Sequence, residues 1–184
     1  VLCEGHKVAQ GFRDSKNPED NWISGSYSIF YWIQNFFFSK ARMQMGGAAS
    51  INGTGFMVKK EVIDEYGFNT VTLTEDVEFT AQCALNNIKV FFAEEAITYD
   101  EQPTEFVASW KQRKRWSAGI LECMKLYSWK LFKNYKKTNQ LFSLDYRFWN
   151  NYEKNFDGKV LLCYEKNYKQ CHRYLVGKFF KFWT

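Results

Sequence analysis

Residues 73–116 decide the fold, and they read LTEDVEFTAQCALNNIKVFFAEEAITYDEQPTEFVASWKQRKRW. Near the start of this stretch, Thr72 and Glu75 have the spacing of a capping box, which predicts a helix that begins near Thr72 or Thr74. Apolar residues recur at helical spacing after it, so the helix is expected to run to about Asn87.

In the second part of the stretch, the spacing of apolar residues changes from that of a helix to that of extended strands. Two extended segments are predicted at Ile88–Phe92 and Ala96–Tyr99, followed by a turn at Asp100–Pro103. A long helical pattern then runs from Thr104 to about Leu131. One helix and two strands between its ends allow the two ends of the stretch to meet in space.

The residues before the stretch also alternate between strand and helix patterns, which predicts an α/β fold. The expected elements are a strand at Lys7–Arg13, a long helix from Trp22 to about Arg42, a glycine loop at Asn52–Gly55, a short buried strand at Phe56–Val58, and a helix at Lys59–Tyr66 closed by Gly67.

Composition places the chain among globular proteins of one domain. It has 184 residues, 46% of them hydrophobic, and a net charge of +5. Five cysteines without a C-x-x-C pair, and only two histidines, favour reduced thiols over a zinc site. The sequence has no uninterrupted apolar run of about 18 residues, so it predicts no membrane-spanning helix. The chain opens without a secretory signal or an initiator methionine, so we expect an internal fragment of a longer protein.

The first end of the stretch offers a base. Asp76 lies near a helix start, where the ionised carboxylate is favoured, and it could accept the proton of an attacking sugar hydroxyl. Glu75 could serve as well, but its side chain is expected to point about 100° away around the helix. The alternative is that both acids only complement the helix dipole.

The second end offers a cation, an amide and an aromatic face. Arg115 suits the oxygens of a diphosphate leaving group, Trp116 suits the apolar side of a sugar ring, and Gln112 can hydrogen-bond nearby. The alternative is a solvated or membrane-facing helix. From 105 to 137 the pattern is basic and amphipathic, which is typical of a helix that lies on an anionic membrane surface.

Taken together, these motifs resemble the second half of the catalytic domain of a processive, membrane-associated family 2 glycosyltransferase. That group includes cellulose, hyaluronan, chitin and poly-N-acetylglucosamine synthases. The matching residues are Thr74-Glu75-Asp76, Gln112-x-x-Arg115-Trp116, Asn52-Gly53-Thr54-Gly55-Phe56, Gln10-Gly11-Phe12-Arg13 and Asp100-Glu101-Gln102-Pro103.

The resemblance implies a partial GT-A domain, the Rossmann-like fold of nucleotide-diphospho-sugar transferases, over residues 1–144 and without its N-terminal half. Asp76 would be the general base. Glu75, Gln112, Arg115 and Trp116 would bind donor and acceptor, and Gly53, Thr54 and Gly55 would line the sugar pocket. The family uses a UDP-sugar, an oligosaccharide acceptor and Mg²⁺ or Mn²⁺ at the cytoplasmic face of the cell membrane.

The chain also departs from that family. It contains no D-x-D metal site, so we expect no metal ligand in this fragment and no turnover by the fragment alone. The segment 145–184 is rich in Tyr, Asn, Lys and Phe, and we interpret it as a tail that belongs to another reading frame or is unrelated to the family. Two other functions stay open: a non-catalytic carbohydrate-binding module, and a basic, aromatic nucleic-acid binder, which we disfavour.

Overall fold

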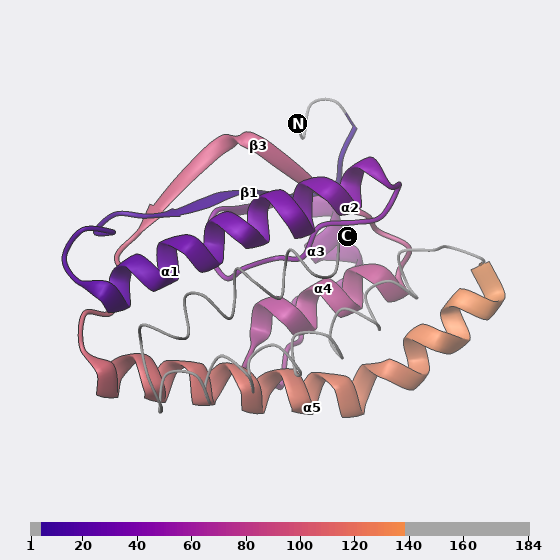
Figure 1. Ribbon diagram of the computed structural model, residues 1–184. Coiled ribbons are helices and arrows are strands. Elements are labelled where there is room, and N and C mark those ends of the chain that lie inside the picture. Colours follow the sequence, from indigo (N-terminus) through magenta and orange to yellow (C-terminus); the bar gives the residue numbers. More distant parts are fainter. Residues whose placement is uncertain (1–4, 139–184) are drawn as a thin grey trace, which may run out of the picture.

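The computed structural model describes residues 5–138, in which a three-stranded sheet is flanked by helices (Figure 1). The strands are β1 (Val8–Ser15), β2 (Phe56–Val58) and β3 (Val90–Asp100), in the order β2-β1-β3. β2 pairs antiparallel with β1, whereas β3 pairs parallel with it. The α/β fold and the strand at Lys7–Arg13 are therefore confirmed. The segment 145–184 lies outside the described residues.

β3 is a single bent strand, so the two separate extended segments predicted from the sequence are parts of one element. Its register with β1 shifts where Gly11 pairs with Ala93 but Phe12 pairs with Ile97. A side chain on Gly11 would collide with the carbonyl oxygen of Ala96, so the bulge requires glycine there. Figure 1 shows the bend, and the half of β3 that follows it is the more exposed half, with Ile97 and Tyr99 53% and 61% exposed.

A long helical segment follows β1, as the sequence predicts. It comprises α1 (Trp22–Ile33), the π-helical η2 (Gln34–Lys40) and α2 (Ala41–Gln44). The side chain of Asn21 caps it, because its Oδ1 accepts from the backbone nitrogens of Ile23 and Ser24 at 2.9 and 3.2 Å. In the wider π turn two consecutive residues, Gln34 and Asn35, are both buried.

The connection between α2 and α4 carries β2 and α3 (Lys60–Tyr66). Gly67 closes α3 with φ 74°, as predicted. The expectation that Phe56–Val58 is buried is wrong, since Met57 is 61% exposed and its neighbours are half-buried. The physical reason is that β2 is short and lies at the edge of the sheet, where only β1 pairs with it.

The helices α4 (Glu75–Leu85) and α5 (Phe106–Thr138) complete the fold. α4 begins where predicted, but the capping box is wrong: Thr74 is the N-cap and its side chain makes no capping bond. The Thr72 hydroxyl instead donates to the carbonyl of Thr74 at 3.3 Å. α5 continues beyond Leu131, the predicted end of the helix.

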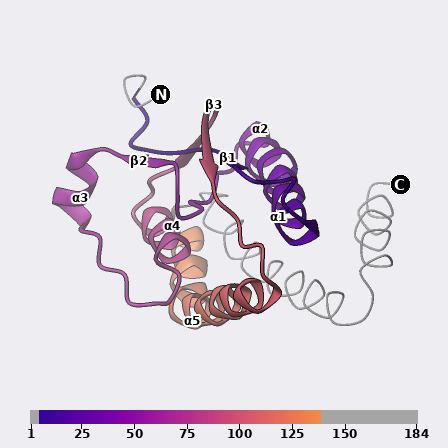
Figure 2. The same ribbon diagram turned by 90° about the vertical axis from the view of Figure 1, so that its left-hand side faces the viewer.

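The core is arranged in layers, with α4 between the sheet and α5 (Figure 2). One apolar cluster joins the sheet to α4 and contains Val8, Phe79 and Val90. A second cluster, with Ala81, Ala84 and Cys123, joins α4 to α5. In a third, Tyr27 and Tyr31 of α1 pack with Trp116 of α5. Within residues 5–138, no helix combines the length and apolar character that crossing a bilayer requires.

Candidate functional site

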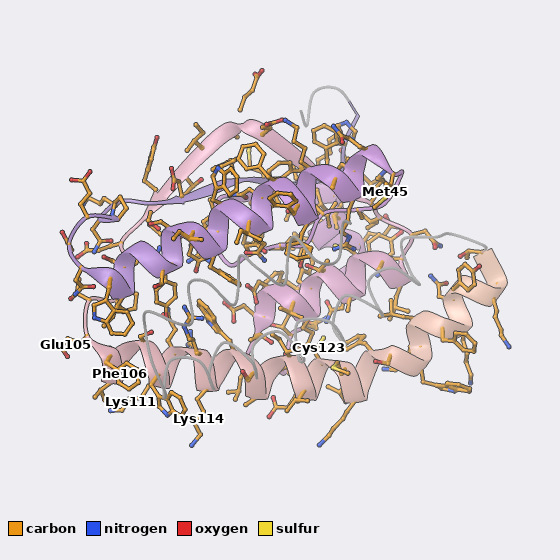
Figure 3. The ribbon with its side chains drawn as sticks, in the orientation of Figure 1. Met45, Glu105, Phe106, Lys111, Lys114 and Cys123 are labelled. Atoms are coloured by element: carbon orange, nitrogen blue, oxygen red, sulfur yellow. The ribbon has the colours of Figure 1, made fainter. Side chains whose placement is uncertain are left out.

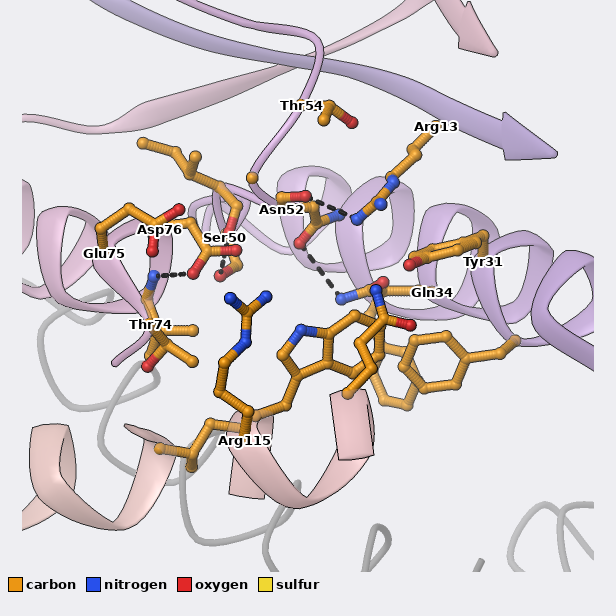
Figure 4. Close-up of a pocket in the computed structure, with 18 of the residues that line it drawn as sticks. Arg13, Tyr31, Gln34, Ser50, Asn52, Thr54, Thr74, Glu75, Asp76 and Arg115 are labelled. Atoms are coloured by element: carbon orange, nitrogen blue, oxygen red, sulfur yellow. Dashed lines mark hydrogen bonds between the residues drawn. The ribbon is translucent and has the colours of Figure 1, made fainter. Parts of the chain in front are cut away.

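A cavity of about 270 Å³, here called the central pocket, lies where α1, α4 and α5 converge below the sheet (Figure 4). Two of its borders come from the two ends of the segment 73–116, at the start of α4 and on α5. Its lining residues are Arg13, Phe30, Tyr31, Ile33, Gln34, Phe38, Ser50, Ile51, Asn52, Gly53, Thr54, Leu73, Thr74, Glu75, Asp76, Val77, Gln112, Arg115, Trp116 and Ile120.

Asp76 lies in the first turn of α4, and its Oδ1 accepts the backbone N–H of Val77 at 2.8 Å. Its Oδ2 faces Gly53, because a Cβ placed on that glycine would lie 3.4 Å from it. Burial raises the pKa of Asp76 above its ordinary value of 3.8, and the charge of Glu75 adds to the effect. Burial thus outweighs the hydrogen bond from Val77, so the expectation that the ionised carboxylate is favoured at this helix start is wrong. The carboxylate is a stronger base than an ordinary aspartate.

Glu75 lines the same pocket as Asp76. Successive helical residues do diverge around the axis, but the pocket encloses the first turn of α4, so that both acids border it (Figure 4). The site therefore contains two neighbouring carboxylates.

Gln112, Arg115 and Trp116 all line the pocket from α5. Their spacing of three and four residues places them on one helical face. The guanidinium of Arg115 points from α5 into the space between α4 and Gln34 (Figure 4). The ring of Trp116 meets the ring of Tyr27 edge-on, with centroids 6.1 Å apart. The structure thus brings the predicted acid, cation and indole together in one pocket.

Contacts between α4 and α5 hold the two ends of the stretch in place. The buried Glu78 accepts the backbone N–H groups of Val71 and Thr72 at 2.8 and 2.7 Å and the hydroxyl of Tyr127 at 2.8 Å. Burial alone would raise the pKa of Glu78, but the hydrogen bonds from Thr72, Tyr127 and Val71 together hold it below its ordinary value. This carboxylate secures the chain that leads into Thr74–Asp76.

The glycine loop contributes only part of what was expected. Gly53 and Thr54 line the pocket, whereas Gly55 is not among its lining residues. Gly55 has φ 66°, a side chain there would collide with Thr98, and its carbonyl accepts the N–H of Gly11 at 2.8 Å. Its role in the fold is therefore to let the loop turn close to β1 and β3.

Three residues in and around the site, Gln10, Arg13 and Asp100, belong to the predicted motif matches but were not predicted as site residues. The buried Gln10 holds the glycine loop, since its amide donates to the carbonyl of Thr54 at 2.8 Å and accepts from the N–H of Asn52 at 2.9 Å. Arg13 pairs with Asp100, and its Nη1 donates to the carbonyl of Asn52 at 2.7 Å.

The same arginine borders the pocket, where its guanidinium lies 4.2 Å from the ring centroid of Tyr31. Its positive charge favours the ionised form of Asp76 and so opposes part of the rise in that pKa. The signal that could have found Arg13 and Asp100 is their place in the Q-G-F-R and D-E-Q-P matches.

Among residues 5–138, no group of three or more His, Cys, Asp or Glu side chains could hold a metal ion. The described cysteines, Cys83 and Cys123, are both buried. Burial raises the pKa of the Cys83 thiol to about 12, so it behaves as an apolar core residue.

Comparison with known proteins identifies the family. The sequence model for glycosyl transferase family group 2 matches residues 2–181. The chain is 31% identical over 84 residues to a β-monoglucosyldiacylglycerol synthase of Synechocystis, which covers 45% of this chain and 18% of that protein. It is 30% identical over 101 residues to the probable glycosyltransferase YdaM of Bacillus subtilis, which covers 54% and 24%.

An uncharacterized glycosyltransferase of Escherichia coli, YaiP, is 28% identical over 92 residues, which covers 50% of this chain and 23% of that protein. The matches thus span about a quarter or less of the length of these curated relatives. The three-stranded sheet and its helices are consistent with a partial GT-A fold. Since the family match takes in nearly the whole sequence, the chain belongs to glycosyl transferase family group 2.

Proposed function

We propose that this chain forms part of the active site of an inverting transferase that moves a sugar from a UDP-sugar to a growing polysaccharide. The observation that carries the proposal is the shared pocket: Asp76 at the start of α4 and Arg115 on α5 line the same cavity. One supplies a base and the other supplies a cation that suits a diphosphate.

The reaction needs a group that accepts the proton of the attacking hydroxyl and a cation that stabilises the negative charge on the leaving diphosphate. The carboxylate of Asp76 takes the proton of the acceptor hydroxyl while its oxygen forms a bond to the anomeric carbon of the sugar. The bond from that carbon to the diphosphate breaks, and UDP leaves with the electron pair. Arg115 meets the charge that develops on the diphosphate, and the face of Trp116 supports a sugar ring. The raised pKa of Asp76 suits a general base.

The acceptor is proposed to be a growing polysaccharide, which is the substrate class that the Q-x-x-R-W motif suggests. The related protein of Synechocystis is named a β-monoglucosyldiacylglycerol synthase, so the acceptor test includes a diacylglycerol as well as oligosaccharides. Release of UDP with an oligosaccharide acceptor alone supports processive polysaccharide synthesis. Release with the diacylglycerol alone contradicts this part of the proposal.

We propose that α5 holds the protein on the cytoplasmic face of the cell membrane. Leu126 and Trp129 are 44% and 61% exposed on this helix, and lysines flank them. Lys133 lies 5.7 Å from the ring centroid of Trp129, an arrangement that keeps the charge beside the ring. Phe106, Lys111 and Lys114 point away from the body of the protein (Figure 3). Exposed aromatic rings among lysines suit an anionic lipid surface, and we propose no nucleic-acid partner.

The Mg²⁺ or Mn²⁺ that this family uses would neutralise the diphosphate. Because the residues from 5 to 138 offer no cluster of metal ligands, we assign them no metal-binding role, and we propose that the longer protein supplies the metal site.

The test restores the upstream sequence from the source genome and measures UDP release from a panel of UDP-sugars. Asp76→Asn should abolish turnover and leave nucleotide affinity unchanged, whereas Arg115→Ala should weaken both. Lys60→Ala, an exposed residue of α3 outside the pocket, is the matched control and should behave as wild type. Turnover by Asp76→Asn at the wild-type rate would overturn the assignment of the base.

A further inference from the structure

Tyr27 of α1 is fully buried and contacts one face of α5. Its hydroxyl lies 3.1 Å from Oγ of Ser109 and donates to Oε1 of Gln112 at 2.9 Å. The guanidinium carbon of Arg113 lies 4.5 Å from its ring centroid, and its ring edge meets Trp116. One side chain on α1 thus contacts four positions along two turns of α5, including two that line the central pocket.

The hydrogen bonds of this contact have a defined direction. A phenol carries one proton, and the proton of Tyr27 goes to Gln112. The Ser109 hydroxyl, which is buried, must therefore donate to the phenol oxygen. The order Ser109 to Tyr27 to Gln112 leaves the amide oxygen of Gln112 occupied.

This hydrogen bond determines which end of the Gln112 amide is left to face the central pocket. A glutamine amide has an accepting oxygen and a nitrogen with two N–H donors. Since the oxygen of Gln112 is held by Tyr27, the nitrogen is the end left for the pocket that this residue lines. Arg115, one turn further along α5, borders the same pocket, so both side chains offer donors.

We infer that Tyr27 is a positioning residue that fixes the amide of Gln112 with its N–H groups toward the central pocket, where they bind an oxygen of the diphosphate. The choice of diphosphate rests on the proposed function, whereas the fixed orientation of the amide rests on the contacts of Tyr27 alone.

The orientation is tested first, without any substrate. In the ¹⁵N-labelled chain, Tyr27→Phe should increase the mobility of the Gln112 side-chain amide, read from nuclear spin relaxation. Gln10, whose amide is held by the carbonyl of Thr54, provides an internal control in the same spectrum and should not change. Ser109→Ala removes a hydroxyl from the same cluster but keeps the bond to Gln112, so the Gln112 amide should stay ordered.

An unchanged Gln112 amide in Tyr27→Phe would overturn the inference. Equal loosening in Tyr27→Phe and Ser109→Ala would overturn it as well, because it would show a general loss of packing.

The ligand is tested next, with UDP and uridine as probes in the protein that carries its upstream sequence. Gln112→Glu still accepts from Tyr27 but replaces the N–H donors with a carboxylate oxygen. It should weaken UDP binding at least tenfold and leave uridine binding unchanged, since uridine has no phosphate. Tyr27→Phe should lower kcat/KM roughly tenfold, the usual effect of one buried hydrogen bond.

Equal binding of UDP by wild type and Gln112→Glu would overturn the inferred diphosphate contact. Failure of the wild type to turn over any UDP-sugar would instead overturn the proposed function, and the amide relaxation would still decide the role of Tyr27.

Discussion

Gly119 on α5 packs directly against Thr74 at the start of α4. A Cβ placed on Gly119 would lie 2.8 Å from the backbone nitrogen of Thr74 and 2.6 Å from its side chain. Gly119 follows Arg115 by one helical turn, and Thr74 precedes Asp76 by two residues. This contact therefore sets how close the two motifs come across the central pocket.

Gly119→Ala is expected to destabilise the protein by about 1–3 kcal/mol, because the new methyl group overlaps backbone atoms that cannot move freely. In an unobstructed helix the same substitution stabilises by about 1 kcal/mol, so the sign of the effect is diagnostic. Denaturant unfolding of the 184-residue chain gives the free energy. A stability gain would show that the two helices are not in contact at this point.

Asp76→Asn is expected to raise stability at neutral pH while it abolishes turnover. The pKa of Asp76 is raised in the folded protein, so the fold binds more protons than the unfolded chain above the ordinary value of 3.8. Stability of the wild type therefore falls as the pH rises through the folded pKa, and the uncharged asparagine avoids this loss.

Unfolding of both proteins between pH 3 and pH 8 tests this expectation. The gain should be smallest near the lower limit, where the aspartate is protonated in both states, and should reach a plateau above the folded pKa. Glu61→Gln, on the exposed side of α3, is the control for removing one negative charge. A gain independent of pH would contradict the raised pKa.

Glu78→Gln is expected to destabilise the protein by about 1–3 kcal/mol, because a neutral amide replaces a buried carboxylate that accepts three hydrogen bonds. The pKa of Glu78 is lowered by those bonds, so their contribution is present above its ordinary value of 4.5 and is lost as the pH falls through the folded pKa.

Tyr127→Phe removes one of these three bonds and should cost about 0.5–1.5 kcal/mol.

Comparison of wild type and Glu78→Gln by acid unfolding is the measurement for Glu78. The wild type should lose its advantage below the ordinary pKa of glutamate, and an advantage that persists at pH 2 would contradict the prediction.

Trp129→Ala is expected to weaken binding to anionic lipid vesicles roughly tenfold, because an exposed indole that inserts among lipid head groups is lost. Met57→Ala is the matched control, since Met57 is also 61% exposed but lies on β2, far along the chain from α5. Co-sedimentation with anionic and neutral vesicles at two salt concentrations is the measurement. Equal binding of Trp129→Ala and wild type would exclude this face of α5 as the membrane contact.

Much of the fold could be predicted because local patterns determine it. The alternation in 7–13, the helical spacing from Trp22 and Gly67 at the end of α3 each carry their own signal. The bulge in β3 carries none of comparable strength, since it depends on the contact between Gly11 and Ala96. The prediction of a capping box was wrong because Glu78, one turn after Glu75, accepts the backbone N–H groups of Val71 and Thr72.

The candidate site also combines features that local sequence patterns predict with features that depend on contacts across the fold. Spacing along α5 suffices to place Gln112, Arg115 and Trp116 on one face. Which residues hold them depends on contacts across the fold, and the sequence does not indicate that Tyr27 meets Gln112 across 85 positions. Roles at the site are a separate matter, and they stay predictions until the variants are measured.

The π turn of η2 has a consequence for the length of the chain. A π-helical turn holds one residue more than an α-helical turn, and such turns arise as single-residue insertions. Deleting one residue between 34 and 40 would therefore restore ordinary α-helical winding without breaking the helix. Because the π turn takes up the extra residue, the side chains before and after the deletion would keep their relative orientation, and only those within the turn would change the direction they face. Gln34, which lines the central pocket, lies inside this turn, so homologues that differ by one residue here should differ in the wall of the pocket.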